Sequence, residues 1–316
     1  MPTAFDRLIA PARRRPALWR LALGLLLVAA LWTLAVVGLF ATAFALGGAE
    51  AFPDRLARLE EGRDPWAVTL VLLTFAGPFA GALLAARLLH GRAPGTLFGP
   101  RGRVLRDLAG AAAIVAVVYA LGLALWELRF DSQPGLPSGA WALWLVPALA
   151  AVALQTGAEE LVFRGYLQSQ LAARFASPFA WAVAPSLLFG AVHWDPGAPL
   201  PVALAIMGSA ALFGLIAADL TARTGSIGAA WGLHLANNTF ALLVLATPGS
   251  LPGLALRLTP YDADDPVMTP MLVGDVATLL LVWALCRWAL APPAARPRAG
   301  ARAEAGAPAP ASRRGA

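Results

Sequence analysis

Residues 139–160 read GAWALWLVPALAAVALQTGAEE, an uncharged run that ends on two adjacent carboxylates. A helix of about 20 apolar residues is long enough to cross the hydrocarbon core of a bilayer. The stretch therefore predicts a membrane-spanning helix. The two glutamates at its end either mark the membrane edge, where placing a charge costs little free energy, or belong to a functional site inside the membrane.

Seven other stretches share this apolar character, and charged residues gather in the links between them. The eight predicted spans are 20–45, 66–88, 107–126, 139–160, 178–194, 200–221, 227–247 and 268–290. The chain is 59% hydrophobic and only 13% charged, whereas soluble proteins are about 25% charged. The predicted fold class is all-α, a polytopic membrane helical bundle of about eight transmembrane helices.

One transmembrane domain over residues 20–291 is expected, between a short tail at 1–19 and a tail at 292–316. The first apolar run is longer than the apolar part of a cleaved signal peptide, so it is interpreted as an anchor that stays. The last tail is rich in Ala, Pro, Gly and Arg, a composition that predicts disorder.

The basic residues indicate how the chain is oriented. All 24 of them are arginine, and they concentrate in the first tail, in the link after the second span and in the last tail. Arginine-rich links favour the cytoplasmic side. Both termini are therefore expected in the cytoplasm, in a chain whose composition suggests a bacterial inner membrane.

The same composition argues against two other classes of protein. The arginines lie at the ends of apolar segments and form no stripe interleaved with aromatic residues, so a nucleic-acid partner is not expected. A single cysteine, Cys286, allows no disulfide within the chain and no cysteine metal cluster, and it is interpreted as a packing residue. The expected partners are the lipid bilayer and a membrane protein or peptide substrate.

The charges that follow the quoted stretch form a local pattern. Glu160 and Arg164 are four residues apart, so on a helix they lie on one face and can pair. Glu159 points about 100° away from Glu160 around the helix and has no such local partner. Simple alternation of spans puts Glu159 at the cytoplasmic end of the fourth span, and the depth of a site there stays open.

The chain has three histidines, and two of them lie in predicted spans. His90 follows the second span beside arginines and is interpreted as an interfacial residue. His193 and His234 are expected to face the bundle interior, because a polar group facing lipid is costly. Glu159 and His193 lie equally far from the turn at 174–178. An antiparallel helix pair would therefore bring them face to face.

Small residues near these histidines suggest tight helix packing. Gly190 would allow its helix to approach the Glu159 helix closely, and Gly228 with Gly232 would hold the seventh span against a neighbour. Two further acids lie at or within spans. Asp219 is expected to pair with Arg223 four residues later, whereas Asp275 has no obvious partner.

Two chemistries suit a carboxylate, two imidazoles and the carboxamide of Asn238 in one pocket. In the first, Glu159 is a general base that takes a proton from water with help from His193, while His234 and Asn238 donate to the oxyanion. In the second, Glu159, His193 and His234 hold Zn²⁺ with an open water position. The usual His-Glu-x-x-His signature of such zinc sites is not present.

These residues resemble the CAAX protease and bacteriocin-processing family, also called the type-II CAAX prenyl endopeptidase or Abi family. Its three motifs are Glu-Glu-x-x-x-Arg, Phe-x-x-x-His and His-x-x-x-Asn. All three occur here in order, over roughly residues 139–245. The matching positions are Glu159, Glu160, Arg164, Phe189, His193, His234 and Asn238.

The resemblance implies an intramembrane endopeptidase with a peptidase core at about 139–245 and no metal cofactor. The implied catalytic residues are Glu159 and His193, which activate water, and His234 and Asn238, which form the oxyanion site. Glu160, Arg164 and Phe189 are implied in support. A prenylated substrate is not implied for a bacterial member, so the substrate is expected to be a membrane-associated protein or peptide.

Two alternatives remain open. The chain could be a non-catalytic membrane scaffold or bacteriocin-immunity-type protein that retains the fold. It could also be a small-molecule transporter with a polar site at the bilayer midplane. Transporters are often built from internal repeats, and no repeat is evident in this sequence.

Overall fold

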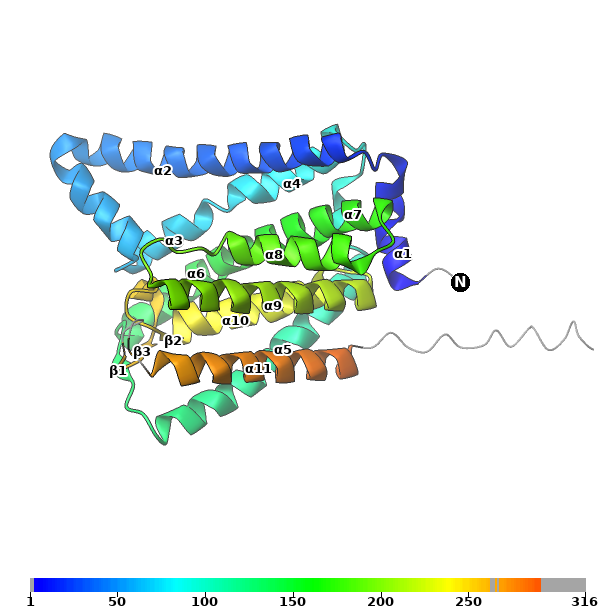
Figure 1. The fold of residues 1–316 in the computed structure, drawn as a ribbon. Helices are drawn as coiled ribbons and strands as arrows, with labels where there is room; N and C mark the ends of the chain where they lie inside the picture. The colour runs from blue at the N-terminus through cyan, green and yellow to red at the C-terminus, as the bar shows by residue number, and fades with distance from the viewer. Residues whose placement is uncertain (1–2, 262–264, 266, 291–316) are drawn as a thin grey trace, which may run out of the picture.

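A computed structural model describes residues 3–261, 265 and 267–290. At 268–270 it describes the helical backbone and not the side chains. The chain is almost entirely helical (Figure 1). The α-helices are α1 Ala4–Ile9, α2 Leu18–Glu61, α3 Pro65–Leu73, α4 Ala76–Leu88, α5 Arg101–Glu127, α6 Ser138–Glu160, α7 Ser169–Arg174, α8 Ala184–Ala191, α9 Leu200–Thr224, α10 Gly228–Thr239 and α11 Met268–Ala289. The predicted tail at 292–316 lies outside the described residues.

Short helical segments of other types connect several of these helices. Three have 3₁₀ geometry: Ala10–Arg14, Pro94–Leu97 and Pro252–Leu254. Three have π geometry: Leu161–Gln168, Phe179–Val183 and Phe240–Val244. The strands are β1 Gln133–Pro134, β2 Leu245–Ala246 and β3 Arg257–Leu258. They pair in the order β1-β3-β2, with β1 antiparallel and β2 parallel to β3.

The helical membrane bundle predicted from the sequence is confirmed. Each of the eight predicted spans contains helix, and within the described residues six helical rods are long and apolar enough to cross a membrane. The other two, at 178–194 and 227–247, form shorter helices. Pro196, Gly197 and Pro199 follow the first of these, and its α-helix ends at Ala191. The second carries His234 and two asparagines, which lower its hydropathy.

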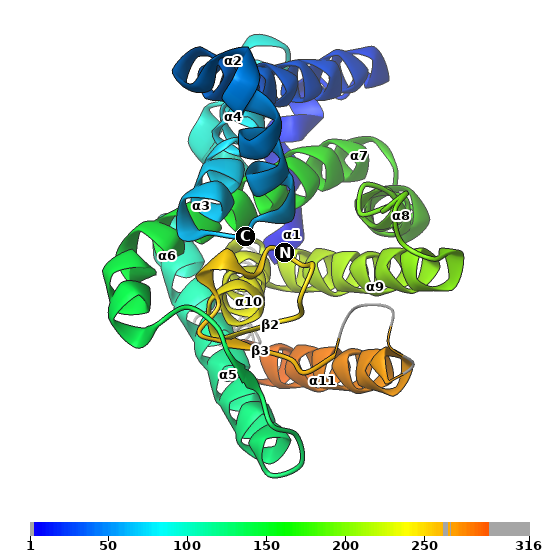
Figure 2. The same ribbon diagram turned by 90° about the vertical axis from the view of Figure 1, so that its left-hand side faces the viewer.

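The helices run side by side, and the functional part of the sequence lies in the middle of them. In the end-on view, α10 lies at the centre, and it contacts α5, α6 and α9 (Figure 2). Helices α2, α3 and α4 form one edge of the bundle. Helix α1 and the end of α11 lie at the same end of the bundle, and the short strands lie at the other (Figure 1).

The helix that begins at Ser138 does not stop at the two glutamates, as the predicted fourth span did. It continues through the π segment Leu161–Gln168 into α7, giving one rod of 37 residues, Ser138–Arg174. Glu159 and Glu160 therefore lie near the middle of a rod about 55 Å long. The charges do not end the helix because Arg164 and His234 lie beside them. π geometry is often found at functional sites.

Glycines bring α10 and α8 close to their neighbours. A Cβ on Gly228 or Gly232 would collide with the Val104 and Leu108 carbonyls of α5, which confirms the predicted tight packing of that span. A Cβ on Gly190 would lie 2.5 Å from the Met207 carbonyl of α9. The close approach expected at Gly190 is therefore made to α9 and not to the helix of Glu159.

Helices α9 and α11 are joined by a polar contact that differs from the predicted one. Asp219 accepts a hydrogen bond from Trp283 at 2.9 Å and lies 3.6 Å from the Arg287 guanidinium. Its partner is therefore Arg287 on α11, and the predicted pair with Arg223 is wrong. Cys286 is fully buried among apolar side chains of α5, α9 and α11, as expected of a packing residue.

His90, which the sequence suggested as interfacial, is buried inside the protein with only 2% of it exposed. Its Nδ1 lies 2.9 Å from the Arg15 carbonyl oxygen, and its Nε2 lies 2.8 Å from the Tyr166 hydroxyl. The neighbouring Arg92 donates to Ser169 at 2.9 Å. The imidazole thus ties the N-terminal segment and the link after α4 to the long rod at the arginine-rich end of the bundle.

Burial lowers the pKa of His90 below its usual 6.5, with added repulsion from Arg92, Arg20 and Arg15. The unfolded chain then binds more protons than the folded protein. The contribution of His90 to the free energy of unfolding should therefore be full above pH 6.5 and should be lost as the pH drops below 6.5. We expect a lower unfolding midpoint at about pH 5.5 than at about pH 7.5, and a smaller difference in His90→Gln. Equal differences in the two proteins would contradict this role.

Candidate active site

The polar residues of interest come from two helices that cross at the centre of the bundle. Helix α6 carries Gln155, Glu159 and Glu160, and α10 carries His234 and Asn238. Arg164 follows on the same rod as the glutamates, in the π segment. We call Glu159, Glu160, Arg164 and His234 the acid–imidazole cluster.

Glu160 is the fully buried member of this cluster. Its Oε1 accepts a hydrogen bond from Arg164 Nη1 at 2.9 Å and lies 2.8 Å from His234 Nδ1. Such short charge-assisted bonds offset the cost of burying the carboxylate. The predicted Glu160–Arg164 pair is confirmed, and it also fixes the imidazole of α10.

An aromatic wall covers the other side of Arg164. The guanidinium carbon lies 4.7 Å from the centre of the Phe189 ring, which is close enough for a cation–π interaction. Phe213 stacks on Phe189 with ring centres 5.9 Å apart, and it meets the His234 ring edge to face at 4.8 Å. Arg164 and His234, which these rings contact, are only 2% and 4% exposed.

His234 lies between the two glutamates. A carboxylate can only accept hydrogen bonds, so Nδ1 must be the donor to Glu160. Nε2 points the other way and lies 3.6 Å from Glu159 Oε2. This distance is longer than a direct hydrogen bond, so the two atoms are neighbours that do not bond to each other directly.

Glu159 has one occupied and one open oxygen. Oε1 accepts from Gln155 Nε2 at 2.7 Å. Oε2 is buried and has no hydrogen-bond partner among the described residues, although the side chain as a whole is 14% exposed. Glu160 Oε2 is likewise buried without a partner among the described residues. Glu159 differs from Glu160 in that its side chain is partly exposed, at 14% against 0%.

Asn238 joins the same site from α10. Its Nδ2 donates to Gln155 Oε1 at 2.9 Å, and its Oδ1 accepts from Asn237 Nδ2 at 3.1 Å. Tyr119 on α5 donates its hydroxyl to Asn237 Oδ1 at 2.7 Å. The carboxamide predicted from the sequence is thus brought to Glu159 through Gln155.

His193 is placed differently from what the sequence suggested. It follows the end of α8, and its Nδ1 lies 2.7 Å from the Phe189 carbonyl oxygen. In the described part of the chain no carboxylate lies within 4.0 Å of its ring, so the predicted contact with Glu159 is not seen. The reason is the packing of α8 against α9 at Gly190. Phe189 connects the two imidazoles, with its ring centre 4.7 Å from that of His193 and 6.1 Å from that of His234.

This separation bears on the zinc alternative. Among the described residues no group of three His, Cys, Asp or Glu side chains could hold a metal ion. The proposed zinc ligands Glu159, His193 and His234 are not brought together, because His193 stands beyond Phe189. The donor set therefore does not fit a tetrahedral zinc site.

Three residues of the site were not recognised from the sequence: Gln155, Tyr119 and Phe213. Gln155 carried a signal, since it is polar within an apolar span and lies four residues before Glu159. Tyr119 is one of three tyrosines in the chain. The sequence gives no sign that Phe213 approaches His234, because that contact depends on how α9 packs beside α10.

Asp275 is the acidic residue for which the sequence suggested no partner. It lies on α11 and is exposed at the surface of the protein.

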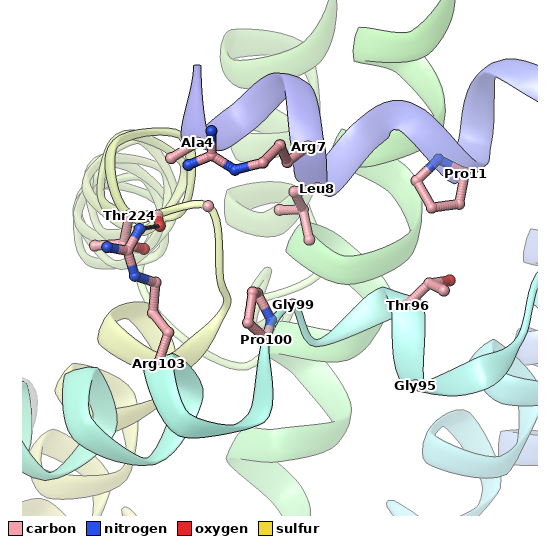
Figure 3. Close-up of a pocket in the computed structure, with 11 residues that line it drawn as sticks. Ala4, Arg7, Leu8, Pro11, Gly95, Thr96, Gly99, Pro100, Arg103 and Thr224 are labelled. Carbon is pink, nitrogen blue, oxygen red and sulfur yellow. Dashed lines mark hydrogen bonds between the residues drawn. The ribbon is translucent and has the colours of Figure 1, made fainter. Parts of the chain in front are cut away.

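Two cavities lie away from the acid–imidazole cluster. One of about 400 Å³ lies between α1, the link before α5 and the end of α9, where Arg7 and Arg103 lie beside Thr224 (Figure 3). The other, of about 550 Å³, is mostly apolar and lies between α2 and α3. Neither cavity is lined by a residue of the cluster.

Comparison with known proteins finds a family match over the part of the chain that carries the acid–imidazole cluster. Residues 137–240 match the family described as type II CAAX prenyl endopeptidase Rce1-like. The match runs from the start of α6 to just beyond α10, so it includes every residue of the three motifs, and the resemblance stated above is confirmed. The uncharacterized protein YyaK of Bacillus subtilis (strain 168) is 28% identical over 255 residues, covering 78% of this chain and 84% of that relative. No solved structure matches the chain.

Proposed function

We propose that this chain is an intramembrane endopeptidase, because its residues 137–240 match the type II CAAX prenyl endopeptidase Rce1-like family. Its substrates are peptide bonds of membrane-associated proteins or peptides. The observation that carries the proposal is the open Oε2 of Glu159, buried in the middle of a membrane rod and 3.6 Å from His234 Nε2.

Water held between Glu159 Oε2 and His234 Nε2 is the nucleophile, so this proposal gives His234 a role in holding water in place of the oxyanion role expected from the sequence. Glu159 takes its proton as the oxygen attacks the scissile carbonyl, and it later returns that proton to the leaving amine. Asn238 has one N–H bonded to Gln155 and a second N–H left to donate to the oxyanion. Glu160 and Arg164 hold the imidazole of His234 in place.

His193 acts from the end of α8 in this proposal. Nδ1 is occupied by the Phe189 carbonyl, which leaves Nε2 to contact water or the substrate. Phe189, between the two imidazoles, sets how far apart they stand.

The catalytic groups work without a metal ion in this proposal. We expect the purified protein to keep its peptidase activity after exhaustive treatment with a chelator, with less than one metal ion bound per chain. Loss of activity on chelation that added Zn²⁺ restores would contradict the metal-free mechanism.

We propose the plasma membrane of a bacterium as the location, with both termini in the cytoplasm. The support is that α1 and the end of α11 lie at one end of the bundle (Figure 1), the end that also carries His90, Arg92 and Arg103. Arginine-rich ends remain on the cytoplasmic side.

The experiment that tests the function compares the membrane peptides of cells that express the protein with those of cells that express Glu159→Ala. Mass spectrometry of new peptide ends identifies the bonds that are cut. The proposal expects ends that occur only with the wild-type protein. If the biological effect of the protein persists in Glu159→Ala and no such ends are found, the chain is a non-catalytic scaffold or immunity-type protein.

A further inference from the structure

Four hydrogen bonds link α5 to Glu159 in an unbroken chain. Tyr119 donates to Asn237 at 2.7 Å, and Asn237 donates to Asn238 at 3.1 Å. Asn238 donates to Gln155 at 2.9 Å, and Gln155 donates to Glu159 Oε1 at 2.7 Å. Every bond runs in the same direction, toward the carboxylate. We call Tyr119, Asn237, Asn238 and Gln155 the amide relay.

The direction of the amide relay follows from the carboxylate at its end. An ionised Glu159 can only accept, so Gln155 must turn its NH₂ group toward it and its carbonyl oxygen toward Asn238. That oxygen can only accept from the NH₂ of Asn238, and the same reasoning passes through Asn237 to the hydroxyl of Tyr119. One ionised oxygen therefore fixes the orientation of three carboxamides.

The far end of the amide relay is held rigidly. The Tyr119 ring meets the Phe240 ring edge to face, with centres 5.1 Å apart. Helix α5 lies in direct contact with α10, because Gly228 and Gly232 have no side chains to separate them. A hydrogen-bond chain anchored at a packed tyrosine can restrict side-chain rotation at its other end, and bonds in such chains strengthen one another.

We propose that Tyr119 and Gln155 are positioning residues for the hydrolytic reaction, acting through the amide relay on Glu159 and Asn238. The inference rests on the proposed function and deepens it. By occupying Glu159 Oε1, Gln155 leaves Oε2 as the oxygen that faces His234 and water. By accepting from Asn238, it turns the NH₂ group of Asn238 toward the site and away from Asn237, so a donor is available for the oxyanion.

The test uses purified full-length protein and a quenched-fluorescent peptide built from a bond that the wild type cuts. Gln155→Leu should lower kcat roughly 10- to 100-fold, and Tyr119→Phe about 3- to 10-fold. KM should change little, because neither side chain needs to touch the substrate. Gln155→Glu keeps the size of the side chain but replaces its donor by an acceptor, so it should not restore kcat.

Combining the substitutions distinguishes a relay from two separate effects. If Tyr119 acts only through the relay, adding Tyr119→Phe to Gln155→Leu should lower kcat no further. The matched controls are Tyr166→Phe and Gln168→Leu, which each remove a buried hydrogen bond of similar length on the same rod but outside the relay. Both controls should retain the wild-type kcat.

Infrared spectroscopy gives a readout that needs no activity. The difference spectrum between the wild type and Glu159→Gln identifies the carboxylate bands of Glu159. Gln155→Leu should shift these bands, Tyr119→Phe should shift them in the same direction by less, and the two controls should leave them in place.

Three outcomes would overturn the inference: normal kcat in Gln155→Leu, full rescue by Gln155→Glu, or additive losses in the double variant. Each of these leaves the proposed function standing if the wild type cleaves and Glu159→Gln does not. If the wild type cleaves no peptide, the proposed function fails, and the infrared bands alone decide whether the relay positions Glu159.

Discussion

Glu159→Gln is expected to lower kcat/KM by about 10²- to 10⁴-fold, the usual contribution of a positioned general base. The substitution keeps the shape of the side chain, and its oxygen can still accept the hydrogen bond from Gln155. What it removes is the ability of Oε2 to take a proton from water. The protein should therefore fold and insert normally while cleavage is lost, as measured with purified protein on a single peptide substrate.

The matched control for this variant is Glu127→Gln. Glu127 lies at the end of α5 and pairs with Arg257 at 3.9 Å, outside the acid–imidazole cluster. It should leave kcat/KM unchanged. Equal activity in Glu159→Gln and the wild type would remove Glu159 from the mechanism.

Arg164→Met is expected to destabilise the folded protein by about 3–5 kcal/mol, the usual effect of breaking a buried ion pair. Glu160 is fully buried and would keep only His234 as a partner. The measurement is reversible unfolding by sodium dodecyl sulfate in mixed micelles. Arg174→Met, at the exposed end of the same rod, is the control, and it should change stability by less than about 0.5 kcal/mol.

A second substitution should largely restore the stability lost in Arg164→Met. In Glu160→Gln combined with Arg164→Met, neither side chain carries a charge, so no buried charge is left without its partner. A double variant as unstable as Arg164→Met alone would show that Arg164 stabilises the fold mainly through Phe189 and its aromatic neighbours. That result would leave the pairing with Glu160 without an energetic role.

The fold could be predicted because apolar runs of membrane length are a strong local signal. The Glu160–Arg164 pair was also predictable, since i and i+4 residues meet on any helix. What could not be predicted was the end of the fourth span. A sequence shows that a charge is present, but not that His234, 74 residues later, lies beside it and lets the helix continue.

The candidate site residues stay a prediction, and the structure differs from the geometry that was expected of them. The equal spacing of Glu159 and His193 from the 174–178 turn suggested a direct contact, yet α8 packs on α9 through Gly190. The partner of Asp219 likewise proved to be Arg287 on another helix. Contacts between helices depend on which faces meet, and a single sequence does not specify them.

The amide relay shows the same limit at the chemical level. Gln155 lies four residues before Glu159 in the sequence. Its proposed role in positioning Glu159 depends on Asn238 and on Tyr119, which come from two other helices. Polar residues in apolar spans indicate a site, and only the fold shows which hydrogen bonds they make.

The central claim is that Glu159 activates water for peptide hydrolysis inside the membrane bundle. The most direct measurement incubates the purified protein in lipid vesicles with a membrane peptide in H₂¹⁸O and reads the new carboxyl ends by mass spectrometry. Wild-type protein should produce ends that carry ¹⁸O, and Glu159→Gln should produce none above the rate without protein. Labelled ends formed by Glu159→Gln as fast as by the wild type would contradict the claim.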